Sequence, residues 1–118
     1  MSAETLLRAA LAAHAPLAAL VGTRIATDRA EEGWPRPFVV FSRTGCENHS
    51  DLDNKTLGAM VFLELQVWAD SRAGAESVAQ ACQDAIENAG EAVTGRSSGY
   101  DPDLDVEASM LMVEWWQD

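Results

Sequence analysis

Residues 57–90 read LGAMVFLELQVWADSRAGAESVAQACQDAIENAG, and this stretch carries the clearest secondary-structure signals of the chain. Apolar residues at every second position from Val61 to Val67 predict a strand over Leu57–Ala69 with one buried face. A helix is predicted over Ser71–Ala89, because its first residue is a good cap, apolar residues recur every three or four positions, and Gly90 follows. A strand followed directly by an amphipathic helix indicates a sheet with helices packed against it.

The same rules divide the rest of the chain into short elements. Gly45–Thr56 is polar and longer than an ordinary hairpin loop, and such loops are usually functional or disordered. The other predictions are a helix from Ser2 to about Ala13, a turn over Leu17–Val21, an edge strand Arg24–Arg29, a loop Glu31–Pro37, a strand Phe38–Arg43, a short strand Ala92–Thr94, a loop Gly95–Pro102 and a last strand from about Leu104 to Trp116. We therefore expect one α+β domain over residues 1–118, with two layers: a mainly antiparallel sheet and two helices packed on one face.

The composition excludes several classes of function. The chain has 118 residues and a net charge of −11, and residues 61–118 carry twelve of the 19 acids but only two of the eight basic residues. Such a surface repels nucleic acid and anionic lipid, so a protein that grips DNA is not expected. No apolar run reaches the length of a membrane span, and no basic leader precedes Ala13-His14-Ala15, so neither a spanning helix nor a secretory signal is expected.

The cysteines and histidines indicate no catalytic site. Cys46 and Cys82 form no Cys-x-x-Cys pair, which is consistent with free thiols in a reducing cytoplasm. Cys82 falls on the apolar helix face and is expected to be buried. His14 ends an apolar stripe and His49 lies in a polar segment, which is not the arrangement of a catalytic triad. We therefore assign no catalytic residue and no cofactor, and we do not expect an enzyme.

One group of carboxylates leaves an alternative open. Asp101, Asp103, Asp105 and Glu107 alternate at the start of the last predicted strand, so they are expected to share a face. Oxygen ligands suit Mg²⁺ or Ca²⁺, and a small metal-dependent enzyme is one alternative function. A solvated strand face, or an edge protected by charge, explains the same pattern, so no metal site is assigned. Asp51 and Asp53 in the polar segment carry the same two interpretations.

The tryptophans point to a protein interface. Trp115 and Trp116 are neighbours on a predicted strand, so their side chains must lie on opposite faces of the sheet. One is expected in the core and the other on the outer face, near Trp68 or Phe62. An exposed tryptophan surrounded by charge usually marks a contact with another protein, although the chain's own loops are an alternative cover.

The order of these segments resembles the tail-completion or tail-terminator proteins of long-tailed bacteriophages and gene transfer agents. The resemblance rests on residues spread along nearly the whole chain rather than on one motif. They are the Leu-Leu-Arg-Ala-Ala-Leu helix at 6–11, the Pro-Leu-Ala-Ala-Leu-Val-Gly-Thr-Arg-Ile run at 16–25, Asp28-Arg29-Ala30, Pro37-Phe38-Val39-Val40-Phe41, Leu65-Gln66-Val67-Trp68-Ala69-Asp70 with the alanine-rich helix after it, and the final strand that ends in tryptophan.

The resemblance implies a structural role in the virion. Such a protein is expected to form a ring, expected to be a hexamer, that caps the completed tail tube and joins it to the head connector or stopper protein. Genomic DNA passes through the ring without specific binding. The implied location is the head-proximal end of the tail, after assembly in the bacterial cytoplasm. A dimeric module that binds a small ligand is a further alternative.

A ring closes when one surface of a subunit binds a different surface of the next. Arginines of the near-neutral first half are therefore expected to face acids of the second half, and part of the acid excess is expected to line the lumen. The candidate interface residues are Arg24, Arg29, Arg36, Arg43, Asp51, Asp53, Trp68, Trp115 and Trp116.

Overall fold

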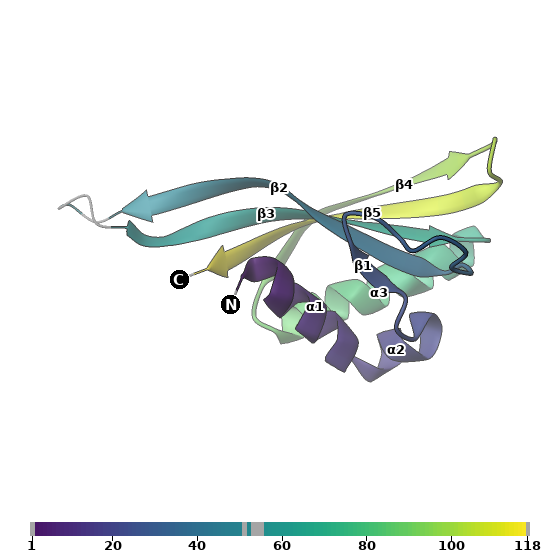
Figure 1. Cartoon of the computed structure of the whole chain (residues 1–118), viewed down its shortest axis with the longest axis horizontal. Helices are drawn as coiled ribbons and strands as arrows, with labels where there is room; N and C mark the ends of the chain where they lie inside the picture. The colour runs from purple at the N-terminus through teal and green to yellow at the C-terminus, as the bar shows by residue number, and fades with distance from the viewer. Residues whose placement is uncertain (1, 51, 53–55, 118) are drawn as a thin grey trace.

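A computed structural model describes residues 2–50, 52 and 56–117, and its helices all pack on one side of a five-stranded sheet (Figure 1). The sheet order is β1-β2-β3-β5-β4, with β1 parallel to β2 and the other neighbours antiparallel. The predicted α+β class with a mainly antiparallel sheet is confirmed. The elements are α1 (Ala3–Ala13), α2 (Ala15–Val21), β1 (Ile25–Thr27), β2 (Phe38–Ser50), β3 (Thr56–Ala69), α3 (Arg72–Asn88), β4 (Ala92–Asp101) and β5 (Val106–Gln117).

The core lies between the helices and the inner face of the sheet. The alternating apolar residues of β3, Val61 to Val67, are at most 1% exposed, as their spacing predicts. They meet the buried stripe of α3 and Leu7 and Leu11 of α1, so removal of apolar surface from water holds the two layers together. Ala89, which the helix stripe was expected to include, is exposed because α3 ends one residue earlier.

The predicted caps of α1 and α3 are both present, and the structure contains one further helix, α2. The Ser2 and Ser71 hydroxyls accept hydrogen bonds from the backbone N–H groups of Thr5 and Gly74. The segment predicted as a turn over Leu17–Val21 is helix α2 instead. Pro16 stands in its first turn, where the fixed φ angle of proline suits a helix. No single described helix is long and apolar enough to cross a membrane; α1 and α2 pass that test only as a pair bent by 86°.

The prediction of a loop over Gly45–Thr56 is wrong for residues 45–50 and 56, which belong to strands. Strand β2 continues to Ser50, β3 begins at Thr56, and the two remain paired out to Ser50 opposite Thr56. Figure 1 shows this hairpin extending past the helices, so neither of its faces meets the core. Backbone pairing forms the strands there without apolar alternation, which is the signal that sequence reasoning needs. We call Thr44–Ser50 and Leu57–Ala59 the arm.

The far edge of the sheet is also longer than predicted. The segment Gly95–Pro102 belongs mostly to β4, which runs to Asp101, and β5 begins at Val106 rather than Leu104. Arg96 holds this edge strand to α3 by donating to Gln80 and Gln83 and by pairing with Glu76 at 2.9 Å. Most side chains of β4 are exposed, and serine and glycine are frequent among its residues, so its sequence resembles a loop.

The two cysteines are expected to differ in reactivity. Cys82 is fully buried on the inner face of α3, and this burial raises the pKa of its thiol to about 12, so almost none of it is thiolate at pH 8. Cys46 is exposed on the arm. We expect a thiol reagent at pH 8 to label one cysteine in the folded chain and two in denaturant, as counted by intact mass. Rapid labelling of both in the folded chain would contradict this packing.

Candidate interaction surface

The face of the sheet that points away from the helices is only partly covered. Phe62, Glu64, Gln66 and Trp68 of β3 lie on this outer face and are each partly exposed. Met112 of the neighbouring β5 is 43% exposed on the same face, since it pairs with Glu64. This face is therefore only partly covered, as predicted, and apolar side chains on it are exposed to solvent.

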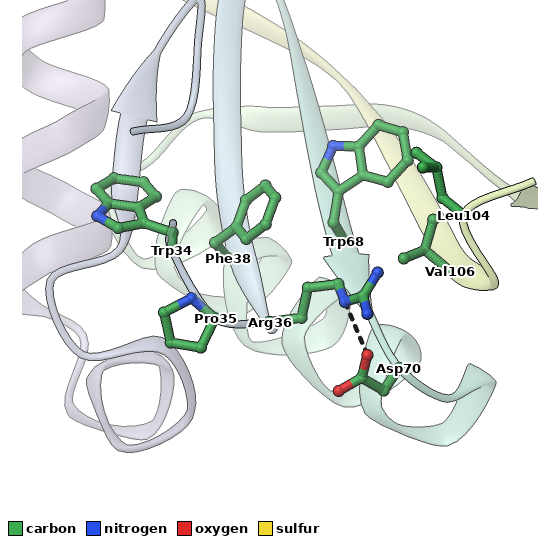
Figure 2. A pocket seen from close by; sticks show the side chains of 8 residues that line it. All are labelled: Trp34, Pro35, Arg36, Phe38, Trp68, Asp70, Leu104 and Val106. Carbon is green, nitrogen blue, oxygen red and sulfur yellow. Dashed lines mark ion pairs between the residues drawn. The ribbon is translucent and has the colours of Figure 1, made fainter. Parts of the chain in front are cut away.

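At one end of the outer face, Trp68 lines a pocket of about 560 Å³. Figure 2 shows Trp34 and Phe38 on one side of it and Trp68 with residues of the β4–β5 hairpin on the other. Arg36 and Asp70 form an ion pair at the rim, with Nε and Oδ1 2.7 Å apart. We call this the aromatic pocket. Its lining residues are Trp34, Pro35, Arg36, Phe38, Trp68, Asp70, Leu104 and Val106.

Strand register places these residues together. Phe38 is the first residue of β2 and lies directly opposite Trp68 near the end of β3. The ring of Trp34, in the proline-containing loop before β2, lies 6.2 Å from that of Phe38 and is tilted by 57°. Trp68 has the small residue Ala108 as its partner on β5, which leaves space beside the indole ring. The pocket therefore combines three chain segments that are distant in sequence.

The chemistry of the pocket favours a protein contact. Its two charged residues already neutralise each other, and the rest of its lining is mainly apolar and aromatic. Interfaces concentrate their binding free energy in such partly enclosed aromatic pockets, which accept an apolar side chain of the partner. The volume also lies within the usual range for small-molecule sites, but a ligand site normally presents several converging polar groups.

The structure gives three of the four candidate arginines partners within the chain. Arg36 pairs with Asp70, and Arg43 Nε lies 2.6 Å from a carboxylate oxygen of Glu4. Arg24 Nε donates to the backbone carbonyl of Pro37 at 3.0 Å. Arg29 is exposed and has no ion pair among the described residues. Partly exposed pairs of this kind contribute little stability, so they do not prevent these arginines from contacting another subunit.

The terminal tryptophans lie on opposite faces, as predicted. Trp115 is 4% exposed in the core. The expected position of Trp116 beside Trp68 is wrong, because the register pairs Trp116 with Met60 at the base of the arm, which leaves Phe62 as its diagonal neighbour on β3. Its ring centroid lies 5.4 Å from that of His49, and its backbone N–H donates to Glu91. Trp68 and Trp116 thus belong to two separate surfaces.

The absence of a side chain at Gly58 leaves space for the indole ring of Trp116 against the arm. A β-carbon added at this glycine would lie 2.5 Å from an atom of the indole ring and 2.8 Å from the carbonyl oxygen of Gln117. We expect Gly58→Ala to destabilise the fold by about 1–3 kcal/mol, measured by urea unfolding. Gly99→Ala in β4 is the control, because a β-carbon there meets nothing within 4 Å. Equal stability of both variants would contradict this packing.

The alternating carboxylates do not share a strand face. Asp101 ends β4, Asp103 and Asp105 lie in the turn, and only Glu107 is in β5. An Asp101 oxygen accepts the backbone N–H of Asp103 at 3.0 Å, so this carboxylate shapes the turn. Among the described residues, no group of three or more potential ligand side chains is placed to hold a metal ion. Asp51 and Asp53 lie outside the described residues.

Sequence reasoning found only part of the aromatic pocket. Arg36 and Trp68 were candidates, but Trp34, Phe38 and Leu104 were not, although all line the pocket. The available signal is a tryptophan four residues before a strand that begins with phenylalanine. That signal becomes useful only when the register places the phenylalanine opposite Trp68.

Comparison with known proteins identifies relatives in sequence and in fold. The family described as "Tail completion protein gp17" matches residues 5–118. A solved chain described as "Virion of native gene transfer agent (GTA) particle" has a TM-score of 0.77 and 22% identity, with 94% of this chain and 90% of that chain covered. At this identity the likeness concerns the fold. A search of curated proteins finds no match.

Proposed function

Because the chain belongs to the tail completion protein gp17 family, it is a structural protein of the phage-type tail, and we propose that it ends tail assembly as a ring. The ring, expected to be a hexamer, caps the head-proximal end of the finished tube and stops its growth. It then joins the tube to the connector or stopper protein of the head, while DNA passes through the lumen. Assembly takes place in the bacterial cytoplasm, and residues 1–118 act as one domain.

The family match over nearly the whole chain is the observation that carries this proposal. The surface supports it in two places. The aromatic pocket offers an apolar contact at one end of the sheet, and the arm extends past the helices at the other end (Figure 1). A subunit of a ring that meets its neighbours and two different proteins needs several separate contact surfaces. We assign the tube or connector contact to the pocket residues Arg36 and Trp68 and to the arm with Trp116 beside it.

The acid excess also has a role in this proposal. The described acids Asp84 and Glu87 lie on the exposed side of α3, and Asp103 and Asp105 lie on the β4–β5 turn. If part of this charge lines the lumen, repulsion of the phosphate backbone keeps the passing DNA from binding. The electrostatic potential of the assembled ring tests this directly, and a basic bore would contradict it.

Binding to tube ends tests the proposal. Purified protein is mixed with purified tail tubes, and electron microscopy records where gold-labelled protein lies and whether the tubes still add subunits. We expect saturable binding at one end of each tube, followed by loss of further growth at that end. Binding along the tube wall, or continued growth at a saturated end, would contradict the proposal. A core-destabilised variant serves as the matched negative control.

A further inference from the structure

Three arginines on one edge of the molecule have no carboxylate partner in the part of the chain that the structure describes. Arg8 of α1, Arg24 before β1 and Arg29 after it form no ion pair among the described residues. Arg24 donates only to the backbone carbonyls of Pro37 and Leu20. In a chain of net charge −11, residues 1–30 hold these three arginines against two acids. We call Arg8, Arg24 and Arg29 the arginine edge.

An apolar hollow lies within this edge. It has a volume of about 340 Å³, and most of the surface that lines it is apolar. Arg8 lines the hollow, and in the sequence Arg24 stands between Thr23 and Ile25, two other residues that line it. The lining residues are Arg8, Ala12, Ala18, Gly22, Thr23 and Ile25. The arginine edge therefore combines positive charge with a recess for an apolar side chain.

The β4–β5 hairpin has the complementary properties. Residues 101–107 carry Asp101, Asp103, Asp105 and Glu107 and no basic residue. None of these four acids forms an ion pair within the part of the chain that the structure describes. Leu104 lies between two of these acids in sequence and is 63% exposed. An exposed leucine flanked by carboxylates is suited to an apolar recess that Arg8 lines.

Hydrogen bonds within the hairpin fix this shape before any contact forms. Asp101 accepts the backbone N–H groups of Asp103 and Leu104, at 3.0 and 3.4 Å. The Tyr100 hydroxyl donates to Asp105 at 2.7 Å, and this bond raises the pKa of Tyr100. A surface that is already ordered loses little conformational entropy when it binds. The side chain of Asp103 is exposed and forms no hydrogen bond among the described residues, so it remains available to a partner.

The two surfaces belong to opposite edges of the sheet: the arginine edge flanks β1, and the acidic hairpin ends β4. The order β1-β2-β3-β5-β4 separates the β1 edge from the β4 edge by four strand spacings, which is roughly 19 Å. Two different, complementary surfaces at opposite edges produce a head-to-tail contact between copies, and a ring of subunits is built from contacts of this kind. Opposite charges across an interface also fix its register and exclude wrong partners.

We propose that the β4–β5 hairpin of one copy docks on the arginine edge of the next copy, with Leu104 at the hollow and the acids facing the arginines. This inference rests on the proposed ring and names the contact that joins its subunits. It replaces the broader expectation for Arg36 and Arg43, whose partners within the chain are Asp70 and Glu4.

A charge swap tests this contact. Arg29→Asp and Asp103→Arg are each expected to weaken self-association about 10-fold or more, measured by sedimentation of the protein alone and by cross-linking on tube ends. The side chains of Arg29 and Asp103 form no ion pair with other described residues, so we expect both variants to keep the wild-type melting temperature. The double variant restores the opposite charges in reversed order and is expected to recover most of the association. Glu32→Arg, an equal charge change at an exposed position in the loop before β2, is the matched control.

The outcomes separate this contact from the proposed function. Wild-type rings that persist in both single variants, or a double variant no better than either single one, would overturn the hairpin contact and leave the ring standing. Wild-type protein that forms no ring, either alone or on tubes, would overturn both. Loss in both single variants with recovery in the double variant supports the contact.

Discussion

Replacing Trp68 with alanine is expected to weaken tail completion about 30-fold or more while the protein remains folded. The indole ring forms one wall of the aromatic pocket, opposite Phe38 and beside the space left by Ala108. Tryptophans in such pockets often contribute 2 kcal/mol or more to an interface, and that free energy corresponds to roughly a 30-fold change in affinity. The measurement is the protein concentration that half-saturates tube ends.

Met112→Ala is the matched control for this prediction. Met112 is exposed on the same outer face, but it does not line the pocket. We expect this variant to complete tails as the wild type does. Equal activity of Trp68→Ala and the wild type, with both fully folded by circular dichroism, would contradict a role of the aromatic pocket in tail completion.

Replacing Phe41 with alanine is expected to have the largest effect on stability. Phe41 is 1% exposed and is the largest of the fully buried side chains. It lies opposite Leu65 at the centre of the sheet, where it packs against the helical layer. The lost apolar contact and the cavity left behind together cost about 3–5 kcal/mol, measured by urea unfolding. That is a large part of the total stability of an ordinary domain, which is roughly 5–15 kcal/mol.

Phe38→Ala separates the two faces of the same strand. Phe38 lies three residues before Phe41 but lines the aromatic pocket on the outer face and is only partly buried. We expect this variant to lose less stability than Phe41→Ala and to lose more tube-end binding per folded molecule. The reverse order for the two variants would contradict the assignment of the faces.

The sequence predicts the core elements well because their apolar periodicity reports burial. The alternation from Val61 to Val67 and the stripe of α3 both describe surfaces that meet the core, and both caps are local hydrogen bonds. Helix α2 was missed because a helix of only seven residues, with a proline in its first turn, resembles a turn. Its helical packing is visible only when Leu17 and Val21 are known to be buried together.

The elements outside the core were missed for the opposite reason. The arm and β4 are paired strands with polar, mostly exposed side chains, so their backbone bonds leave no trace in the hydrophobic pattern. The site depends on the same information. Trp68 was recognised as a candidate from its residue type alone, but its neighbours Trp34 and Phe38 follow from the register. Register is a property of long-range pairing, and single-residue patterns do not contain it.

The length of tails assembled without this protein shows whether the protein ends tail assembly. Cells that produce all the other tail components are prepared with and without the chain, and electron microscopy measures the tubes. We expect tails of uniform length when the protein is present and tubes of variable, extended length when it is absent. Tubes of normal, uniform length in its absence would contradict a role in ending tail assembly.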